Sequence, residues 1–329
     1  MTRPVVPARI ATPAPAVEPS AAPSPPASDH LCLFNSAAFH ELTLTAGQTR
    51  LQLDHYDDDR LVGSLVGVVT GDEFTSGFSA PFGGIDLVRE TESLPRILDL
   101  VRATCQRVEG LGIRTISIHA RPPVYSRVDV SLEFALLSSG FAIQSFELNQ
   151  HLDLAEIRSP DDYVARLGWR GRRDLRRAAA QRLEFIEDLE PSQRAEAYEV
   201  LRLNREAKDR LLRLSLDYLE RLGELMPGRI RTFSLLAGGT ACAAAVVYSI
   251  RPGRWLLVYW GDANHHLDQS PMNLLAFKLV ERALAEQVEL IDLGISSVDG
   301  RLNPGLAQFK ESVGASSTLR LGLVRRRDG

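Results

Sequence analysis

Apolar and polar positions alternate along the chain with two periods, one of two residues and one of three to four. The two-residue period is typical of half-buried strands, and the longer period of helices with one buried face. From residue 30 to about 149 the two patterns take turns. This part of the chain is predicted to contain strands at 51–55 and 61–69, a helix from 94 to 105 that ends at Gly110 and Gly112, a strand at 113–119, a helix at 132–137 and a strand at 141–148.

The rest of the chain repeats this order and adds helices after its first strand. Gly238 and Gly239 predict a tight hairpin turn, because glycine adopts positive φ without strain. Ser270 and Pro271 predict the cap and first turn of a helix. The expected elements are a helical stretch at 163–181, a strand at 183–189, helices at 192–210 and 216–225, strands at 231–237, 241–250 and 255–260, a helix from 271, a strand at 290–293, a helix at 304–313 and a strand at 318–324.

This order predicts an α/β fold with mixed sheets and helices on their faces. We expect two similar domains, an N-terminal one over residues 30–152 and a C-terminal one over residues 153–329, the second with a helical insert. Residues 1–29 are almost entirely Pro, Ala, Ser and Val. Such a segment buries too little apolar surface to offset its ordering entropy, so we expect a disordered tail there.

Composition adds limits on the function. The formal net charge of −4 argues against a general nucleic-acid coating protein, and no DNA partner is expected. Cys32, Cys105 and Cys242 are far apart and fit neither a disulfide framework nor a zinc pattern. No run of 18 apolar residues exists, so we expect no membrane partner and a place in the cytoplasm.

Four stretches of the second half occur in an order that resembles the GNAT and FemAB-like acyltransferases, a bacterial-type family of biosynthetic transferases. They are the arginine-rich stretch 170–179, the segment from Gly261-Asp262 to Ser270-Pro271, the strand end Ile291-Asp-Leu-Gly294, and Gly305-Leu-Ala-Gln-Phe309-Lys310-Glu-Ser-Val-Gly314. In the first half, Ser79-Ala-Pro-Phe-Gly83-Gly84 resembles a loop of the same proteins. The resemblance implies tandem GNAT-like domains and acyl transfer, with the catalytic site in the second.

Acyl transfer requires a donor ester or thioester beside an amine or hydroxyl, and a group that stabilises the oxyanion. GNAT-like sheets do this with parted strands whose N–H groups face the carbonyl, so no side-chain triad is required. The segment between Asp262 and Asn273 lacks the glycine pattern with which typical GNAT enzymes hold coenzyme A. No permanently bound cofactor or metal is expected. The co-substrate is expected to be an acyl-CoA, an acyl-carrier protein or an aminoacyl-tRNA.

The candidate residues for donor binding are Arg172, Arg173 and Arg176, with Ser270 and Asn273 at the start of the later helix. Guanidinium forks match phosphate oxygens, and all three donors carry phosphates. A solvated helix face in an arginine-rich protein is the alternative.

Lys310, Asp292 and Phe309 are the candidate catalytic residues. Lys310 is one of only three lysines in a chain that otherwise uses arginine, which indicates that lysine specifically is required there. A compact ammonium can approach a phosphate or a developing oxyanion where a guanidinium fork would not fit; a plain lysine on the helix surface is the alternative. Asp292 ends a buried strand, where a carboxylate is costly unless paired; it either orients the acceptor amine or caps a loop. Phe309 is either a core residue or, as the resemblance implies, a contact of the donor.

The candidate residues for substrate binding are Ser79, Gly83, Gly84, Tyr259 and Asp262. The two glycines allow a backbone to approach the acceptor, although a simple turn explains them as well.

Three functions follow as hypotheses. The first is transfer of an acyl group from a CoA or carrier-protein thioester to the amine of a small acceptor. The second is a Fem-like transfer that depends on aminoacyl-tRNA and forms a peptide or ester bond. The third is an inactive GNAT-like binding module. Retention of the Phe309-Lys310 pair argues against the third.

Overall fold

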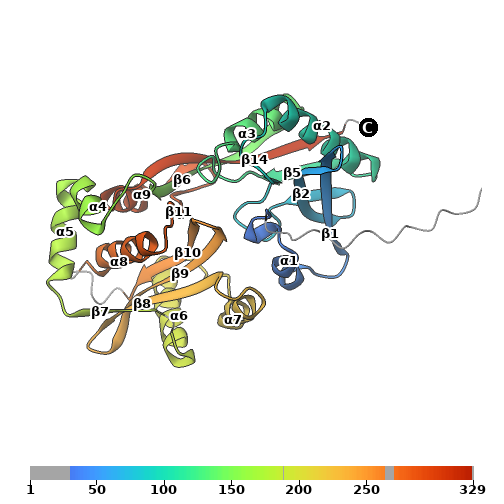
Figure 1. Cartoon of the computed structure of the whole chain (residues 1–329). Helices are drawn as coiled ribbons and strands as arrows, with labels where there is room; N and C mark the ends of the chain where they lie inside the picture. The colour runs from blue at the N-terminus through green and yellow to red at the C-terminus, as the bar shows by residue number, and fades with distance from the viewer. Residues whose placement is uncertain (1–29, 188, 264–269, 328–329) are drawn as a thin grey trace, which may run out of the picture.

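The computed structural model describes residues 30–187, 189–263 and 270–327, and the account below concerns these residues (Figure 1). The expected tail 1–29 and much of the interval between Asp262 and Asn273 lie outside them. No helix within the described ranges is long and apolar enough to cross a membrane.

The first half alternates strands and helices, as its pattern predicts. Its elements are η1 (Leu33–Asn35), α1 (Ala37–Thr43), β1 (Gln48–Asp57), β2 (Arg60–Thr70), β3 (Glu73–Ser76), β4 (Ile85–Leu87), α2 (Leu94–Gly110), β5 (Thr115–His119), α3 (Asp129–Ser138) and β6 (Ala142–Asp153).

The second half has the predicted hairpin and the predicted helical insert, which is α6 and α7. Its elements are α4 (Pro160–Arg166), α5 (Trp169–Ala179), β7 (Leu183–Ile186), α6 (Pro191–Glu206), α7 (Leu216–Leu225), β8 (Ile230–Ala237), β9 (Thr240–Arg251), β10 (Arg254–Asp262), α8 (Pro271–Ala285), β11 (Leu290–Ile295), β12 (Ser297–Val298), β13 (Arg301–Leu302), α9 (Pro304–Ser312) and β14 (Ser316–Arg326).

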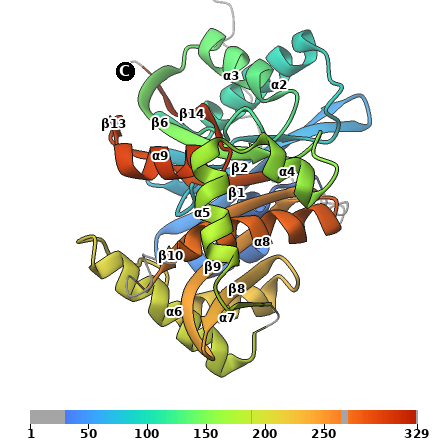
Figure 2. The ribbon, with the colours of Figure 1, turned by 90° about the vertical axis from the view of Figure 1, so that its left-hand side faces the viewer.

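One mixed sheet runs through both halves in the order β1-β2-β3-β5-β14-β6-β11-β10-β9-β8-β7, with β4 beside β2 (Figures 1 and 2). The last strands of the two halves are exchanged. β14, the end of the chain, pairs with β5 of the first half, whereas β6 pairs with β11 of the second. The predicted division into two domains between residues 152 and 153 stays a prediction, because one continuous sheet includes strands from both sides of this boundary.

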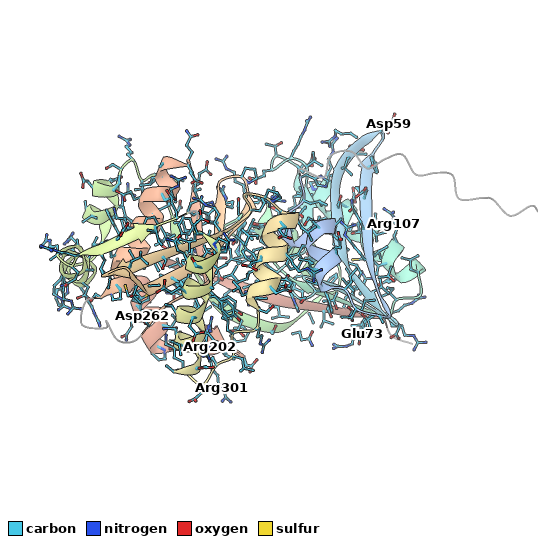
Figure 3. All side chains as sticks on the ribbon, turned by 90° about the horizontal axis from the view of Figure 1, so that it is seen from below. Asp59, Glu73, Arg107, Arg202, Asp262 and Arg301 are labelled. Carbon is cyan, nitrogen blue, oxygen red and sulfur yellow. The ribbon has the colours of Figure 1, made fainter. Side chains whose placement is uncertain are left out.

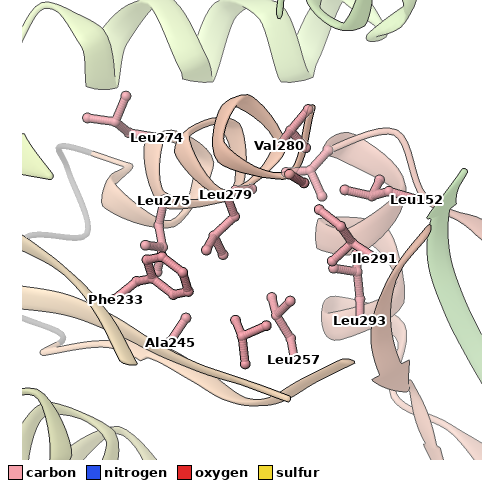
Figure 4. Packing of buried hydrophobic residues seen from close by; sticks show 14 of the residues in the cluster. Leu152, Phe233, Ala245, Leu257, Leu274, Leu275, Leu279, Val280, Ile291 and Leu293 are labelled. Carbon is pink, nitrogen blue, oxygen red and sulfur yellow. The ribbon is translucent and has the colours of Figure 1, made fainter. Parts of the chain in front are cut away.

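Helices cover both faces of the second half. On one face, α8 places apolar side chains at three- and four-residue spacing over β8 to β11 (Figure 4). On the other face lie α1, α6 and α7, which contribute to a second cluster. Alanines 243–245 on the intervening strand β9 are fully buried and small, so helices pack closely on both of its sides. Burial of each large apolar side chain contributes roughly 1.5–3 kcal/mol.

The structure confirms the predicted α/β class and corrects several local predictions. The helical stretch 163–181 is broken at Leu167 and Gly168 into α4 and α5. Ser270 is the N-cap residue of α8 and Pro271 opens the helix, as predicted, but Ser270 has φ of 53° and its side chain forms no capping hydrogen bond. The Gly238-Gly239 turn is confirmed, with φ of 60° and 87°.

Candidate active site

Two neighbouring parallel strands part at the centre of the second half. β10 pairs with β11 only over residues 254–256 and 290–292, although β10 continues to Asp262 and β11 to Ile295. Gly294, with φ of 75°, turns β11 out of the extended conformation just after the last pair. A register shift between Leu257 and Tyr259 bends β10 at the same level. Beyond these three pairs, the backbones of β10 and β11 form no further hydrogen-bonded pairs with each other.

Helix α9 contacts both of the parted strands through two adjacent residues. The ring of Phe309 packs on Trp260 of β10, with ring centroids 5.3 Å apart. Lys310 Nζ donates to the carbonyl oxygens of Gly294 and Ile295 of β11, at 2.8 and 3.0 Å. The Phe-Lys pair singled out from the sequence thus lies where the sheet opens.

Lys310 is only 1% exposed, so it is no surface lysine. Burial lowers the pKa of its ammonium from 10.5 to about 7; nearby Asp292 opposes this shift, and Arg205 and Arg320 add to it. Near neutral pH the side chain can therefore either gain or lose its proton. Such groups are typical of sites that handle charge during a reaction.

Asp292 lies fully buried on β11 and accepts three hydrogen bonds. One oxygen accepts from Tyr125 Oη at 2.8 Å, and the other accepts from Asn149 Nδ2 and Gly294 N, both at 2.8 Å. Burial and the neighbouring carboxylate raise the pKa of Tyr125 well above its ordinary value, so its hydroxyl stays a donor. Asp292 thus does more than cap the loop that follows it, because its hydrogen bonds join residues of both halves.

The loop with Ser79, Gly83 and Gly84 reaches this network indirectly. Phe82 packs on Tyr125 with ring centroids 5.0 Å apart. Gly83 N donates to His119 O, and Gly84 N donates to Ser76 Oγ, so the loop occupies the end of the β3–β5 pair. A Cβ on Gly83 would lie 2.3 Å from Gly77 N, which gives this glycine a packing role. Ser79 is exposed on the same loop.

Tyr259 and Asp262 extend the site along β10 toward α6 (Figure 3 labels Asp262). The guanidinium of Arg205 lies over the Tyr259 ring, 4.8 Å from its centroid. Asn204 Nδ2 donates to the carbonyl oxygen and to the side chain of Asp262, and Lys208 donates to Asn204 Oδ1. These contacts fix α6 against the open end of β10.

The arginine cluster lies on α5, which packs beside α8 (Figure 2). Arg173 pairs with Asp174 and covers Trp169, while Arg172 donates to Ala165 O; Arg176 is exposed. Arg177, from the same helix, donates to the Ser270 hydroxyl. Asn273 is buried in the first turn of α8. The cluster thus reaches the start of α8, and within the described ranges no direct contact joins it to Lys310.

Several residues of the site give no signal in the sequence. Tyr125 lies in a loop, and Asn149 directly follows the predicted strand 141–148. Arg205 and Arg320 are two arginines among many. The exchange of β6 and β14 places Asn149 on the strand next to β11 and Arg320 on the following strand, and this exchange is a property of the sheet.

Comparison with known proteins gives a family match in the second half of the chain. Residues 169–311 match the family model described as an acetyltransferase (GNAT) domain. A search of curated protein sequences finds no match to this chain.

Solved structures show a likeness of fold over most of the chain. FemX superposes with a TM-score of 0.70 at 12% identity, over 90% of this chain and 92% of that one. The C-terminal domain of a putative lysylphosphatidylglycerol synthetase from Agrobacterium fabrum gives 0.55 at 14% identity, over 88% and 87%. L-PGS from Bacillus licheniformis gives 0.54 at 12% identity, over 84% and 85%.

Residues 169–311 thus match a GNAT acetyltransferase domain, and 90% of the chain has the fold that FemX also has. Together these matches support an acyltransferase of GNAT type.

Proposed function

We propose that the chain transfers an acyl group from a CoA or carrier-protein thioester to the amine of a small acceptor. The observation that carries this proposal is the position of buried Lys310 at the parting of β10 and β11, beside Asp292. There the sheet offers unpaired backbone and a lysine of lowered pKa at one point.

In the proposed reaction the amine nitrogen forms a C–N bond to the acyl carbon, and the C–S bond breaks. The thiolate leaves and takes up the proton that the amine loses. Charge develops on the acyl oxygen in between, where a fixed donor stabilises it most. A protonated Lys310 has three N–H donors, of which two point to Gly294 O and Ile295 O. The third is available to the oxyanion.

Asp292 acts on both partners of this reaction. Its charge favours the protonated form of Lys310 and attracts an amine to the same place. Its bonds from Tyr125 and Asn149 hold the carboxylate still, so the acceptor meets a fixed anion. Tyr259, Asp262, Ser79, Gly83 and Gly84 are proposed to line the acceptor's approach.

For the donor we propose the surface of α5 and the start of α8. Arg172, Arg173 and Arg176 would hold phosphates, with Ser270 and Asn273 nearby. Arginine clusters of this kind neutralise several phosphate charges at once.

The alternative is transfer from an aminoacyl-tRNA. Its support is the fold likeness to FemX and to a putative lysylphosphatidylglycerol synthetase, and the missing glycine pattern between Asp262 and Asn273. An inactive binding module is the least supported hypothesis, because Phe309 and Lys310 both contact the strands where the sheet opens.

The test offers one set of amines to three donor classes: acyl-CoAs, an acyl-carrier protein and charged tRNAs. Mass spectrometry follows both the free thiol or tRNA and the condensed product. We expect amine-dependent thioester consumption. Product formed from charged tRNA alone would contradict the thioester proposal and support the alternative.

A further inference from the structure

Arg320 lies on β14 in the middle of the sheet, beside the site described above. Its register places it opposite Glu147 of β6, and Thr318, two residues earlier, opposite Asn149. Asp292 lies opposite His151, the next residue of β6 on that face. Because alternate residues of a strand share one face, Arg320, Thr318, Asn149 and His151 form a row next to Asp292, here called the β6–β14 row.

Among the described residues, the guanidinium of Arg320 forms neither an ion pair nor a hydrogen bond, and Asp292 and Glu147 act on it only from a greater distance. It is half-buried, and burial lowers its pKa. Glu147 is the acid opposite, but its carboxylate accepts from Ser297 Oγ and Asp299 N instead. An arginine held away from water on a rigid strand without an ion pair is unfavourable unless an anion joins it.

Three further polar atoms of the row are buried and, within the described part of the chain, have no hydrogen-bond partner. They are Asn149 Oδ1, His151 Nδ1 and Thr318 Oγ1. Buried side-chain polar atoms are rarely left without partners, and three neighbouring ones indicate a place built for a polar group. The Asn149 oxygen can only accept, so its missing partner is an N–H or O–H donor.

A ligand of the row would therefore need a hydrogen-bond acceptor at Arg320 and a hydrogen-bond donor near Asn149 and Asp292. The two positions lie two residues apart along the strands, which is about 7 Å. A carboxylate and an amine on one small molecule meet both demands. A carboxylate matches the planar guanidinium fork of Arg320, which can donate two parallel hydrogen bonds to it.

We propose that the β6–β14 row binds the acyl acceptor, with a carboxylate on Arg320 and the reacting amine toward Asn149 and Asp292. The acceptor class is then an amino acid with a free carboxylate. This inference rests on the proposed function, because it assigns the acceptor of that same site.

The experiment measures binding to the full chain without any donor. The probes are the twenty standard L-amino acids, each matched with its carboxamide, and inorganic phosphate, at millimolar concentration and constant ionic strength. Thermal unfolding reports binding, since a ligand that prefers the folded state raises the melting temperature. We expect at least one amino acid to raise it and its carboxamide to have little effect.

Variants then assign the effect to Arg320. Arg320→Gln should weaken binding at least about tenfold, as expected for a lost charge-assisted hydrogen bond. Arg320→Lys keeps charge and stem but loses the fork, so it should bind with intermediate strength and serves if the Gln variant fails to fold. Arg326→Gln is the control, because Arg326 is exposed near the end of the same strand.

The proposal is overturned if no amino acid of the panel stabilises the chain, if the carboxamides stabilise it equally, or if Arg320→Gln binds like the wild type. Stabilisation through Arg320 by phosphate alone would also overturn it. Failure of the proposed function has a different signature: an amino acid bound through Arg320 that never becomes acylated. Transfer to amines without a carboxylate would preserve that function and refute this inference.

Discussion

At the scale of single residues, Lys310 is the buried cation of α9 that contacts β11 where the sheet opens. A lysine in a chain of arginines predicts a special requirement, and the structure supplies one in the carbonyl groups of Gly294 and Ile295. Its burial could not be predicted, because helix α9 has a weak apolar period and Lys310 lies on the buried side beside Ala307. Gly294 was predicted only as part of a motif, whereas its positive φ explains why glycine is there.

The lowered pKa of Lys310 predicts a pH dependence of stability. Between pH 7 and 10.5 the unfolded chain still holds the proton that folded Lys310 has lost. Unfolding then takes up a proton, so the free energy of unfolding rises with pH across this window and the cost of burying the charge is fully present below it. Denaturant unfolding should therefore show a steeper rise with pH for the wild type than for Lys310→Met.

The Met variant is the reference because it lacks the ammonium of Lys310, the group whose titration is tested. The absolute stability of the Met variant does not test the pKa of Lys310. The substitution removes a buried charge, which stabilises the fold, and also leaves two carbonyl groups without a donor, which destabilises it. Parallel curves for the two proteins would show that the pKa of Lys310 is ordinary in the folded state.

At the scale of elements, periodicity predicted the longer helices and strands and failed where tertiary contacts decide. The arginine-rich stretch reads as one helix, yet it breaks at Leu167 and Gly168 so that α4 and α5 pack separately. A Cβ at Gly171 would lie 2.0 Å from Ser312 O, so this glycine lets α5 approach the end of α9. The short strands β3, β4, β12 and β13 carry too few residues for a period.

The basic face of α5 gives a prediction at this scale. Replacing Arg172 and Arg173 together with Gln should raise the apparent KM for the donor and flatten its dependence on salt, because fewer phosphate charges are then neutralised. Arg114→Gln, an exposed arginine in the first half, is the matched control. Unaltered KM and salt dependence in the double variant would make α5 a solvated face and place the donor elsewhere.

At the scale of the whole molecule, the sequence predicted two similar halves but not how they join. Local patterns carry no information on which distant strands pair, and the exchange of β6 and β14 is such a pairing. It has a consequence for the site, because Tyr125 and Asn149 of the first half hold Asp292 of the second. A buried ion network, in which Asp86 accepts from Arg121 and Arg251, joins the halves a second time.

The central claim is that Lys310 stabilises charge which develops during acyl transfer. Single-turnover transfer by Lys310→Met, with the donor that proves active, tests it most directly. The variant keeps most of the stem and loses the charge, so the rate of the chemical step should fall by about two to three orders of magnitude while donor binding changes little. Lys310→Arg should restore little of the rate, because the planar fork is wider than the ammonium. A wild-type rate in the Met variant would contradict the account.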